Sequence, residues 1–333
     1  MKEMLRFALI GAGAIAQSYV AVFSGLRYAH VVGVADPALE RARKVAEALS
    51  CPAFASHDEL LLDLEVDAAV ICTPPATHLE VGLDLLERGI PVLCEKPLAL
   101  DHASARKLVD ASTAAGAPLT MAAKFRYVED AVRAKSIVDC GDLGEVVLYD
   151  NTFASHTPMA GRWNVDPTVS GGGVLIDHGT HSVDIARYFL GSITHVMAVA
   201  PRRVQDVAVE DTAQMFIRSS DGVYGTIDLS WSIDVDTDSF ISIYGSEGTI
   251  KVGWNESRYR PAPGADWVKF GDGYDKIQAM RAQVANFCGA LQGREELLIT
   301  GEEAVASVAV IEAAYASMDR SGWVPVNGAA STA

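Results

Sequence analysis

Residues 5–16, LRFALIGAGAIA, join a short apolar run to a turn with two closely spaced glycines and a small residue at its end. The turn has the G-x-G-x-x-A pattern that connects a strand to a helix in dinucleotide-binding domains. Gly11 permits the tight turn, Gly13 lets backbone amides approach a pyrophosphate, and Ala16 lets helix and strand pack closely. The stretch therefore predicts a parallel α/β domain built around a dinucleotide.

The residues that follow supply the next two elements of such a domain. We expect an amphipathic helix over residues 14–23 and a second strand over residues 31–35, which ends in Asp36. A carboxylate at that strand end would bind the adenosine ribose hydroxyls and repel a 2′-phosphate, so it favours NAD over NADP. Arg41 is near enough to complicate this choice, and we interpret it as a solvated helix charge.

Strand and helix patterns keep alternating up to residue 122. We expect strands at residues 67–72, 91–94 and 119–122 and helices at residues 76–88 and 104–115. Alternation with short connections predicts a doubly wound parallel sheet, in which ligands bind at the carboxyl ends of the strands. The segments that follow such strand ends are residues 11–16, 73–75 and 95–97.

Lys96 follows one of these apolar strands and lies between Glu95 and Pro97, which restricts its backbone. It is either a surface lysine in a loop or a group that hydrogen-bonds a substrate hydroxyl and stabilises the resulting oxyanion. His78 either lines the same edge or packs against its own helix. The residues expected to contact the cofactor are Gly11, Gly13, Ala14, Ile15, Asp36, Arg41, Thr73, Pro74, His78, Glu95 and Lys96.

A second motif, GGGVLIDHGTH at residues 171–181, places a carboxylate and two imidazoles within five residues. If a helix begins at Asp177, then Asp177 and His181 are four apart and share one face. A carboxylate beside an imidazole can hold the ring in one tautomer and tune its basicity near neutral pH. The alternative is that Asp177 caps a buried helix and His181 is a hydrogen-bonded core histidine.

These motifs, in this order, resemble those of the Gfo/Idh/MocA family of nicotinamide-dependent oxidoreductases, which act mainly on sugars and cyclitols. The resemblance runs from Phe7 to about Val326. It implies an NAD(P)-binding Rossmann domain over residues 1–122. A substrate-binding and oligomerisation domain with a large, open, mostly antiparallel sheet would follow over residues 123–326. We expect residues 327–333 to form a disordered tail.

The resemblance also implies the catalytic residues. Lys96, Asp177 and His181 match the family's lysine, aspartate and histidine, with His181 as general base, Asp177 orienting it or contacting a neighbouring hydroxyl, and Lys96 polarising the reacting oxygen. The runner-up mechanism makes Lys96 the proton acceptor. The hydride would pass to the nicotinamide. The expected substrate-binding residues are Lys96, Arg126, Tyr127, His156, Arg162, Trp163, Asp177, His178 and His181.

Two of these residues keep an alternative. Trp163 either stacks on the C–H face of a sugar ring or anchors its loop in the core. His178 interrupts a position that is commonly apolar or small in the family, and it either contacts substrate or points into the core.

The implied activity is the NAD-dependent oxidation of a secondary hydroxyl of a sugar, amino sugar or cyclitol to a ketone. Alternatives within enzymes are NADP-dependent reduction of a keto sugar and oxidation of a nucleotide-linked sugar. A non-catalytic NAD-sensing protein is disfavoured because Lys96 and His181 are both present. A metal enzyme using Asp177, His178, His181 and Asp184 is disfavoured because neighbouring helix residues diverge and no Cys/His cluster completes a shell. We therefore expect no metal.

Length, charge and cysteine content limit the kinds of partner and compartment that fit this chain. The chain has 333 residues, a length that favours two domains. Its net charge of −16 argues against nucleic acid as a partner. Five scattered cysteines indicate reduced thiols in a cytoplasmic protein, and no apolar run reaches membrane-spanning length. We expect a homodimer or homotetramer. Ile227, Leu229 and Trp231 alternate in a way that suits either an oligomer contact or the domain's own helices.

Overall fold

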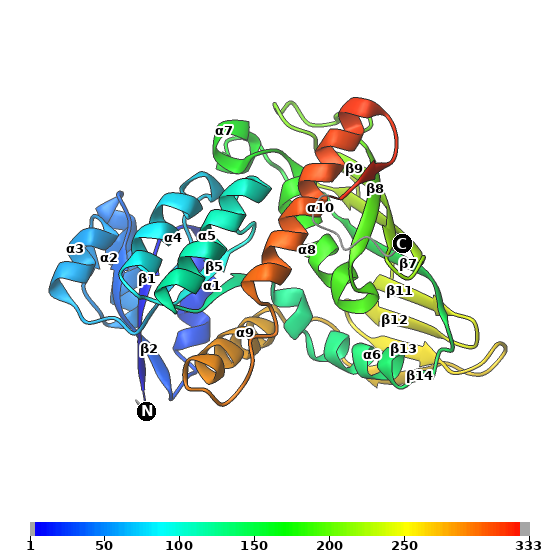
Figure 1. The fold of residues 1–333 in the computed structure, drawn as a ribbon, viewed down its shortest axis with the longest axis horizontal. Coiled ribbons are helices and arrows are strands. Elements are labelled where there is room, and N and C mark those ends of the chain that lie inside the picture. Colours follow the sequence, from blue (N-terminus) through cyan, green and yellow to red (C-terminus); the bar gives the residue numbers. More distant parts are fainter. Residues whose placement is uncertain (1–3, 327–333) are drawn as a thin grey trace. The chain divides into compact units, whose positions relative to one another are not determined.

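The computed structural model describes residues 4–326, and its ribbon is shown in Figure 1. The chain divides into two compact units, which are described in turn. The first unit comprises the chain up to Lys124 together with Lys276–Val305. The second comprises Phe125–Asp275 and the residues from Ala306 onward. The expected tail at residues 327–333 lies outside the described residues.

The first unit is built on a six-stranded parallel sheet with the order β3-β2-β1-β4-β5-β6. The order reverses between β1 and β4, which is the switch point where ligands bind in doubly wound sheets. The prediction of a parallel, doubly wound domain is thus confirmed. Its strands are β1 (Leu5–Ile10), β2 (Ala29–Ala35), β3 (Ala53–Phe54), β4 (Ala68–Ile71), β5 (Val92–Glu95) and β6 (Leu119–Ala122).

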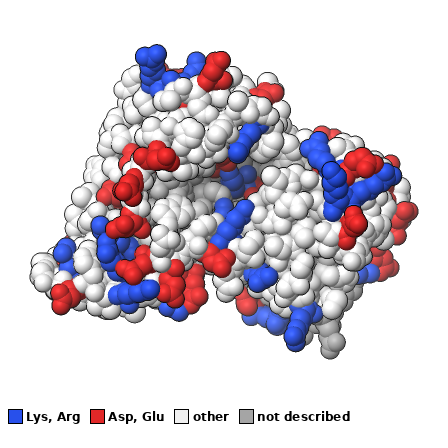
Figure 2. All heavy atoms as spheres, turned by 180° about the vertical axis from the view of Figure 1, so that it is seen from behind, with Lys and Arg blue, Asp and Glu red and all other residues white. Residues whose placement is uncertain are grey.

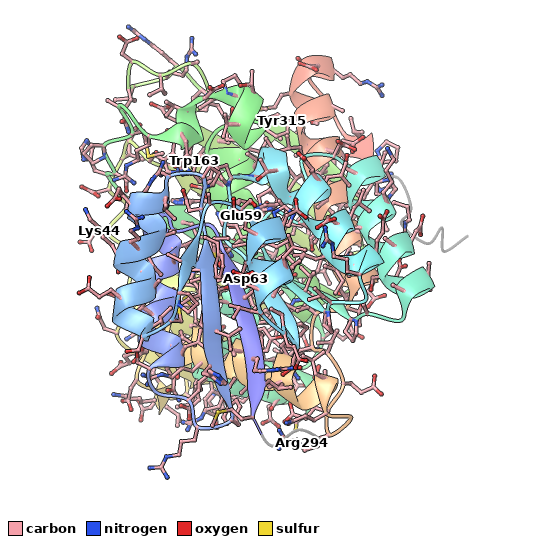
Figure 3. The ribbon with its side chains drawn as sticks, turned by 90° about the vertical axis from the view of Figure 1, so that its left-hand side faces the viewer. Lys44, Glu59, Asp63, Trp163, Arg294 and Tyr315 are labelled. Atoms are coloured by element: carbon pink, nitrogen blue, oxygen red, sulfur yellow. The ribbon has the colours of Figure 1, made fainter. Side chains whose placement is uncertain are left out.

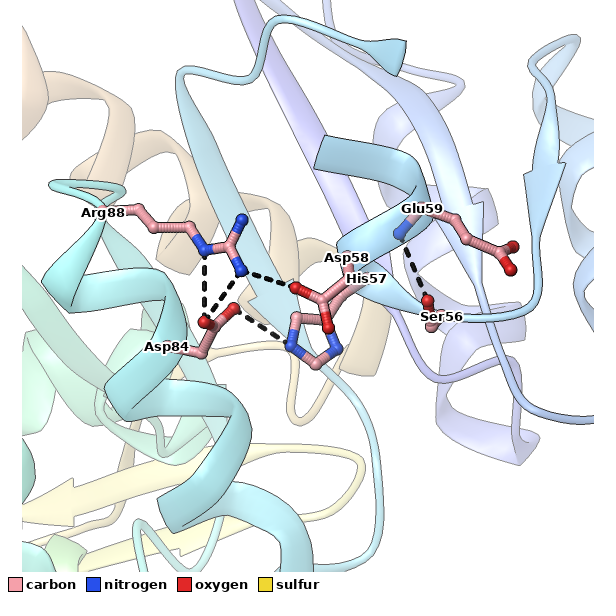
Figure 4. A network of polar contacts seen from close by, with 6 residues as sticks. All are labelled: Ser56, His57, Asp58, Glu59, Asp84 and Arg88. Carbon is pink, nitrogen blue, oxygen red and sulfur yellow. Dashed lines mark hydrogen bonds and ion pairs between the residues drawn. The ribbon is translucent and has the colours of Figure 1, made fainter. Parts of the chain in front are cut away.

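Helices connect these strands, and short polar side chains fix where two of them begin. The helices are α1 (Ala14–Phe23), α2 (Leu39–Leu49), α3 (His57–Asp63), α4 (His78–Glu87) and α5 (His102–Ala115). Ser56 caps α3 by accepting a hydrogen bond from the Glu59 amide at 3.2 Å, and Asp101 caps α5 by accepting one from the Ser104 amide at 2.7 Å. The first of these caps is drawn in Figure 4.

The chain returns to the first unit near its end, which differs from the expected division into two continuous domains at residue 122. Helix α9 (Lys276–Leu291) belongs to the first unit. Its Met280, Val284 and Phe287 are buried in one apolar cluster with Phe7 of β1, and the Phe7 and Phe287 rings lie 6.2 Å apart. The physical reason is that these side chains bury their apolar area against β1 and α1.

The second unit is built on a nine-stranded sheet with the order β14-β13-β12-β11-β7-β10-β9-β8-β15. Its pairs are antiparallel except for β7 with β10, as expected for a mostly antiparallel sheet. The strands are β7 (Val146–Ala154), β8 (Ile193–Val199), β9 (Thr212–Ser219), β10 (Tyr224–Ser230), β11 (Ser239–Gly245), β12 (Thr249–Gly253), β13 (Ser257–Arg260), β14 (Val268–Gly271) and β15 (Val324–Pro325).

Helices cover one face of this sheet (Figure 1). Helix α6 (Glu129–Asp139) packs on β12 and β14, and α8 (Val174–Leu190) packs on β7, β9 and β10. Ile227, Leu229 and Trp231 are at most 1% exposed, and a methyl group at Gly179 of α8 would lie 3.1 Å from Leu229. These three residues therefore face the unit's own helix. The remaining helices are α7 (Pro167–Ser170) and α10 (Gly301–Arg320), and short 3-10 turns lie at Pro75–Thr77, Lys124–Tyr127 and Trp163–Val165.

The surface carries both signs of charge. On the face shown in Figure 2, lysine and arginine side chains are interspersed with aspartate and glutamate side chains. All five cysteines are free thiols. Among residues 4–326, no helix has both the length and the apolar character that spanning a membrane requires.

Candidate active site

The glycine turn after β1 has the geometry that its sequence predicts. Gly11 has a φ of +97°, and a methyl group there would lie 2.7 Å from the carbonyl carbon of Cys72. A side chain at Gly13 would meet no protein atom within 4 Å, and Gly13 gives α1 no side-chain cap. The first turn of α1 also holds no acidic residue, so its N-terminal amides favour an anion. These features fit the pyrophosphate of a dinucleotide.

The other residues predicted around this turn differ in their burial, and their contacts with the cofactor stay predictions. Ala16 is fully buried, which is the close packing predicted for the third position of the motif. Ala14 is exposed and Ile15 is half-buried at the start of α1. Arg41 is exposed on α2, as expected for a solvated helix charge.

Asp36 has a structural contact that sequence reasoning missed. Its Oδ2 accepts a hydrogen bond from the Ala12 amide at 2.8 Å, and its Oδ1 accepts one from the Ala38 amide at 2.8 Å. The residue is 8% exposed. Asp36 therefore holds the end of β2 against the glycine turn, in addition to its predicted contact with the ribose.

The turn after β4 lies next to the glycine turn, because a methyl group at Gly11 would also come within 2.8 Å of the Thr73 nitrogen. The Thr73 hydroxyl accepts a hydrogen bond from the Thr77 hydroxyl at 2.8 Å, and the Pro74 carbonyl accepts one from the same hydroxyl at 2.9 Å. Thr73 and Pro74 thus form an ordered turn at the carboxyl edge of the sheet.

His78 does not have the place expected of a cofactor ligand. Its side chain is fully buried, with Nδ1 2.8 Å from the Pro97 carbonyl oxygen and Nε2 2.8 Å from the Thr73 carbonyl oxygen. Burial lowers the pKa of His78, against the effect of the backbone carbonyls. Because both ring nitrogens face the protein backbone, the prediction that this ring contacts the cofactor is corrected.

Glu95 and Lys96 lie at the carboxyl end of β5, as predicted. Glu95 Oε1 accepts a hydrogen bond from the Tyr19 hydroxyl at 3.0 Å, and Oε2 accepts one from the Lys96 amide at 3.3 Å. Burial raises the pKa of Glu95, while the charges of Lys124 and Lys96 act in the opposite direction. The Lys96–Pro97 peptide bond is cis. Lys124, which follows β6, is a second cation that acts on Glu95, a role that sequence reasoning did not predict.

The three glycines at residues 171–173 precede α8, where backbone packing requires them. Gly171 has a φ of +82°. A methyl group at Gly172 would lie 2.0 Å from the Tyr315 hydroxyl, and one at Gly173 would lie 2.0 Å from the Glu210 carbonyl oxygen. The first turn of α8 can therefore approach Glu210 and Tyr315 only without side chains at these positions. Figure 3 labels Tyr315, which comes from α10.

Glu210 caps α8, a contact that sequence reasoning also missed. Its Oε1 accepts hydrogen bonds from the Gly173 amide at 2.9 Å, the Leu175 amide at 3.1 Å and the Tyr315 hydroxyl at 2.8 Å. The helix begins at Val174, three residues before the expected start. The alternative that Asp177 caps this helix is therefore wrong, because Asp177 already lies inside the first turn.

Asp177 and His181 are four residues apart on α8, as the motif predicted. His181 is 7% exposed, and its ring packs edge-on against Phe125 with 5.1 Å between ring centroids. Phe125 in turn stacks on Tyr274 at 5.1 Å. The His181 imidazole is therefore held by an aromatic cluster, while the Asp177 side chain keeps 22% of its surface exposed.

His178 turns toward the sheet. Its Nδ1 lies 3.3 Å from the Phe153 carbonyl oxygen, and its ring meets the Trp231 ring edge-on at 6.2 Å. Its Nε2 is 4.0 Å from an Asp177 carboxylate oxygen. With 28% of its side chain exposed, His178 is a half-buried neighbour of Asp177 that contacts β7.

Arg126 differs from its expected role as a substrate-binding residue. The Arg126 guanidinium donates to Asp184 of α8 at 2.8 Å, and the two side chains are 4% and 1% exposed. Tyr127 is 7% exposed, the same fraction as His181, and its contact with substrate stays a prediction. Because a buried cation needs its partner charge, Arg126 is committed to Asp184 and is corrected to a structural residue. Asp184, the fourth ligand in the metal-site alternative, is thus already paired with a cation.

His156, Arg162 and Trp163 lie together in an exposed segment between β7 and α7. The His156 amide donates to Asp234 at 2.7 Å, and the Arg162 amide donates to the Met159 carbonyl at 3.1 Å. Trp163, labelled in Figure 3, is 47% exposed and begins a 3-10 turn. The alternative that Trp163 is a buried anchor is therefore wrong. Contacts of these three residues with substrate stay predictions.

One further polar cluster joins α3 to α4 in the first unit (Figure 4). His57, Asp58 and Asp84 place ligand atoms within 4.8 Å of one another. Arg88 reaches between the two carboxylates, at 2.5 Å from Asp58 and 2.9 Å from Asp84, and His57 lies 3.1 Å from Asp84. The guanidinium already supplies the positive charge that these carboxylates favour, so the cluster acts as a link between the helices.

Comparison with protein families gives two matches along the chain. Residues 5–123 match a model described as an oxidoreductase family with an NAD-binding Rossmann fold. Residues 131–251 match the Gfo/Idh/MocA C-terminal domain. Inositol 2-dehydrogenase of Rhizobium meliloti (strain 1021) is 28% identical over 334 residues, covering 94% of this chain and 97% of that protein. The rhizopine catabolism protein MocA of Rhizobium meliloti is 26% identical, with 95% of each chain covered.

Solved structures agree over nearly the full length. GenD2 from gentamicin A biosynthesis, in complex with NAD, has a TM-score of 0.86 and 27% identity, covering 98% of this chain and 97% of that one. Levoglucosan dehydrogenase, in complex with NADH, has a TM-score of 0.89 at 20% identity, which shows the shared fold. One conclusion follows from the glycine turn, the two family matches and these full-length similarities: the chain belongs to the Gfo/Idh/MocA family of NAD-binding oxidoreductases.

Proposed function

We propose that this protein is an NAD-dependent dehydrogenase that oxidises a secondary hydroxyl of a sugar, amino sugar or cyclitol to a ketone. The observation that carries the proposal is the carboxyl edge of the six-stranded sheet. There the glycine turn after β1, the Thr73–Pro74 turn after β4 and Lys96 after β5 follow three adjacent strands. A dinucleotide binds at this edge of a doubly wound sheet, and a lysine there can hydrogen-bond the oxygen whose carbon gives up the hydride.

When bound, NAD supplies the hydride acceptor, and the side chains handle the proton and the oxygen. His181 accepts the proton of the substrate hydroxyl, and Asp177 on the same helix orients the ring or contacts a neighbouring hydroxyl. Lys96 donates a hydrogen bond to the reacting oxygen as negative charge develops on it. The proton acceptor in the runner-up mechanism is Lys96 itself.

The preference for NAD over NADP rests on Asp36. Its carboxylate accepts hydrogen bonds from the amides of Ala12 and Ala38 at the end of β2. Rotating it away from a bound cofactor would break both hydrogen bonds. A fixed anion at this place repels a 2′-phosphate and accepts hydrogen bonds from ribose hydroxyls. Arg41 is on the exposed face of α2 and stays a solvated charge.

The substrate class is supported by the relatives. Inositol 2-dehydrogenases are named for a cyclitol, and GenD2 is named for the biosynthesis of gentamicin A. The net charge of −16 mildly favours a neutral or cationic substrate, such as an amino sugar, over a multiply phosphorylated one.

We also propose a homodimer or homotetramer in a reducing compartment such as the cytoplasm. The five free thiols support the compartment.

Tyr224 and Leu148 are paired across β10 and β7 and are 47% and 49% exposed, whereas Tyr149 next to Leu148 is fully buried. Apolar side chains on the face away from α8 suit a contact between copies. Light scattering of the wild type and of Tyr224→Asp tests it, since the variant should be smaller; equal masses, or a monomeric wild type, contradict it.

The central experiment follows the reduction of NAD and NADP by absorbance across pyranosides, amino sugars and inositols. We expect turnover with at least one substrate and faster turnover with NAD. Turnover on none of them with either cofactor would overturn the proposed substrate class.

A further inference from the structure

The segment between β7 and α7 carries three of the predicted substrate-binding residues. At its start it runs beside the chain that follows β10, where the Thr157 amide donates to the Trp231 carbonyl at 2.7 Å. Beyond Thr157 this pairing ends. Within the part of the chain that the structure describes, a single hydrogen bond then joins residues 158–166 to any residue beyond the adjoining helix α7. In it, the Met159 amide donates to Gln205 Oε1 at 2.9 Å.

Met159 is also the residue at which the turn with Arg162 and Trp163 begins. The Arg162 amide donates to the Met159 carbonyl at 3.1 Å, and Trp163 follows with 47% of its surface exposed. Gly161, with a φ of +76°, lies inside this turn. Because the Met159 amide is bonded to Gln205 and its carbonyl to the turn, the direction of the turn depends on the contact with Gln205.

The neighbours of the Gln205 side-chain amide fix its orientation. Its Nε2 lies 3.0 Å from both the Thr157 and the Trp231 carbonyl oxygens and 3.1 Å from the Ser232 hydroxyl oxygen. The two amide hydrogens can be donated to two of these three oxygens at once. Because carbonyl oxygens only accept, the amide nitrogen faces them, and Oε1 is the atom that accepts from Met159.

A buried carboxylate fixes the backbone from which this side chain extends. Asp211 is fully buried, and its Oδ2 accepts hydrogen bonds from the Gln205 amide at 2.7 Å, the Val204 amide at 2.8 Å and the Ser232 hydroxyl at 2.7 Å. Burial acts to raise the pKa of Asp211, but these hydrogen bonds hold it below its usual value. The Gln205 backbone is therefore held in place by groups outside the segment that its side chain contacts.

This anchor lies beside the helix that carries Asp177. The Trp231 carbonyl oxygen is 3.0 Å from Gln205 Nε2, while the Trp231 ring meets the His178 ring edge-on at 6.2 Å. His178 Nε2 is in turn 4.0 Å from an Asp177 carboxylate oxygen. The turn after Met159 is thus connected, through Gln205 and Trp231, to the part of α8 that holds the candidate catalytic carboxylate.

We propose that Gln205 is a positioning residue for substrate binding. By accepting a hydrogen bond from the Met159 amide, its side chain sets where the turn with Arg162 and Trp163 lies relative to α8. The effect on substrate rests on the proposed function, in which these two side chains contact the sugar or cyclitol. The placement of the turn does not rest on it.

Hydrogen exchange, followed by mass spectrometry without any substrate, tests the placement of the turn. Gln205→Ala removes the acceptor and leaves the Met159 side chain, which is 2% exposed, unchanged. We expect the amides of residues 159–166 to exchange about tenfold faster, as for one lost hydrogen bond. Gln214→Ala is the matched control, because Gln214 is also half-buried and its side chain donates to Asp228, outside the segment, at 2.6 Å. It should leave this exchange unchanged.

Kinetics on a working substrate test the effect on substrate binding. For Gln205→Ala we expect KM to rise by about tenfold with kcat and NADH affinity nearly unchanged, because contacts away from the reacting carbon act equally on bound substrate and transition state. In the background Arg162→Ala/Trp163→Ala, the same substitution should raise KM little further, because the side chains that it places are gone.

Unchanged exchange of residues 159–166 in Gln205→Ala would overturn the proposal and assign the anchoring to the burial of Met159. Equal changes in Gln214→Ala, or KM effects that multiply in the triple variant, would leave Gln205 a purely structural residue. If Gln205→Ala does not fold, Gln205→Met fills the same space without an acceptor and has the same expected results; failure of both to fold contradicts a positioning role.

Two further results separate this proposal from the proposed function. A KM like that of the wild type in Arg162→Ala/Trp163→Ala would overturn the effect on substrate, whatever the exchange of the turn. A panel without turnover would count against the proposed function alone, because hydrogen exchange needs no substrate and still decides whether Gln205 places the turn.

Discussion

The Glu210 carboxylate accepts a hydrogen bond from the Gly173 amide at 2.9 Å, so a side chain from the segment before β9 caps the helix that carries Asp177 and His181. The same oxygen also accepts from the Leu175 amide and from the Tyr315 hydroxyl. An acceptor with a negative charge at a helix N-terminus satisfies open amides and favours the helix dipole. The start of α8 is thereby fixed three residues before Asp177.

Replacing this cap should destabilise the second unit. We expect Glu210→Ala to lower the free energy of unfolding by about 2 kcal/mol, because two helix amides and one hydroxyl lose their acceptor. Tyr315→Phe removes one of the three contacts and should cost about 1 kcal/mol. Urea unfolding followed by circular dichroism measures both. A loss in Tyr315→Phe as large as that in Glu210→Ala would assign the stabilisation to Tyr315.

The two glycines of the cofactor turn should behave differently. Gly11→Ala should destabilise the protein by about 1–3 kcal/mol, because its φ is +97° and its methyl group would meet the Cys72 backbone. Gly13→Ala should melt like the wild type, because its methyl group meets no protein atom, yet it should weaken NADH binding by about tenfold where the pyrophosphate is expected. Thermal melts and NADH titrations separate the two effects. Tight NADH binding by Gly13→Ala would place the pyrophosphate elsewhere.

Asp36 should set the choice of cofactor. In Asp36→Ser, the amides of Ala12 and Ala38 lose their carboxylate and the repulsion of a 2′-phosphate disappears. We expect the ratio of kcat/KM for NAD to that for NADP to fall by at least about tenfold, the value of one charged hydrogen bond. An unchanged ratio would mean that Asp36 only holds the glycine turn.

Arg126 should prove structural. Arg126→Met leaves the buried Asp184 carboxylate without its partner charge and should lower the free energy of unfolding by about 3–5 kcal/mol. The double variant Arg126→Met/Asp184→Leu should regain part of this loss, because no unpaired charge stays buried. The measurement is a double-mutant cycle of urea unfolding. A raised substrate KM with unchanged stability would restore Arg126 as a substrate-binding residue.

His181 should be needed for the chemical step. We expect His181→Ala to lower kcat by about 10²–10⁴-fold, the usual contribution of a general base, with little change in NADH affinity. His30→Ala, at an exposed position of β2, is the control and should keep full activity. Steady-state kinetics on the best substrate of the panel decides it. Near-normal turnover of His181→Ala would remove His181 from the mechanism and favour Lys96 as the proton acceptor.

Much of the first unit follows from local sequence. α1 and β6 have the expected bounds, because apolar runs, glycine turns and helical periodicity act over a few neighbouring residues. The positions of Asp177 and His181 on one helix followed from their spacing in the same way. The resemblance of the chain's motifs to those of the Gfo/Idh/MocA family then indicated the cofactor and the second, mostly antiparallel sheet.

The tertiary structure decided which of these side chains face outward. His78 was expected at the cofactor and is fully buried between Thr73 and Pro97, while Arg126 was expected at the substrate and pairs with Asp184, 58 residues away. Glu210 reaches a helix 37 residues earlier in the chain.

The sequence by itself therefore determined the Rossmann turn, the parallel sheet and the helix that carries Asp177 and His181, because backbone constraints and periodicity are local. Only the tertiary structure decided the return of α9 to the first unit, the cap on α8 and the partners of His78 and Arg126. These depend on burial and on hydrogen bonds between residues far apart in the chain, which local patterns do not encode.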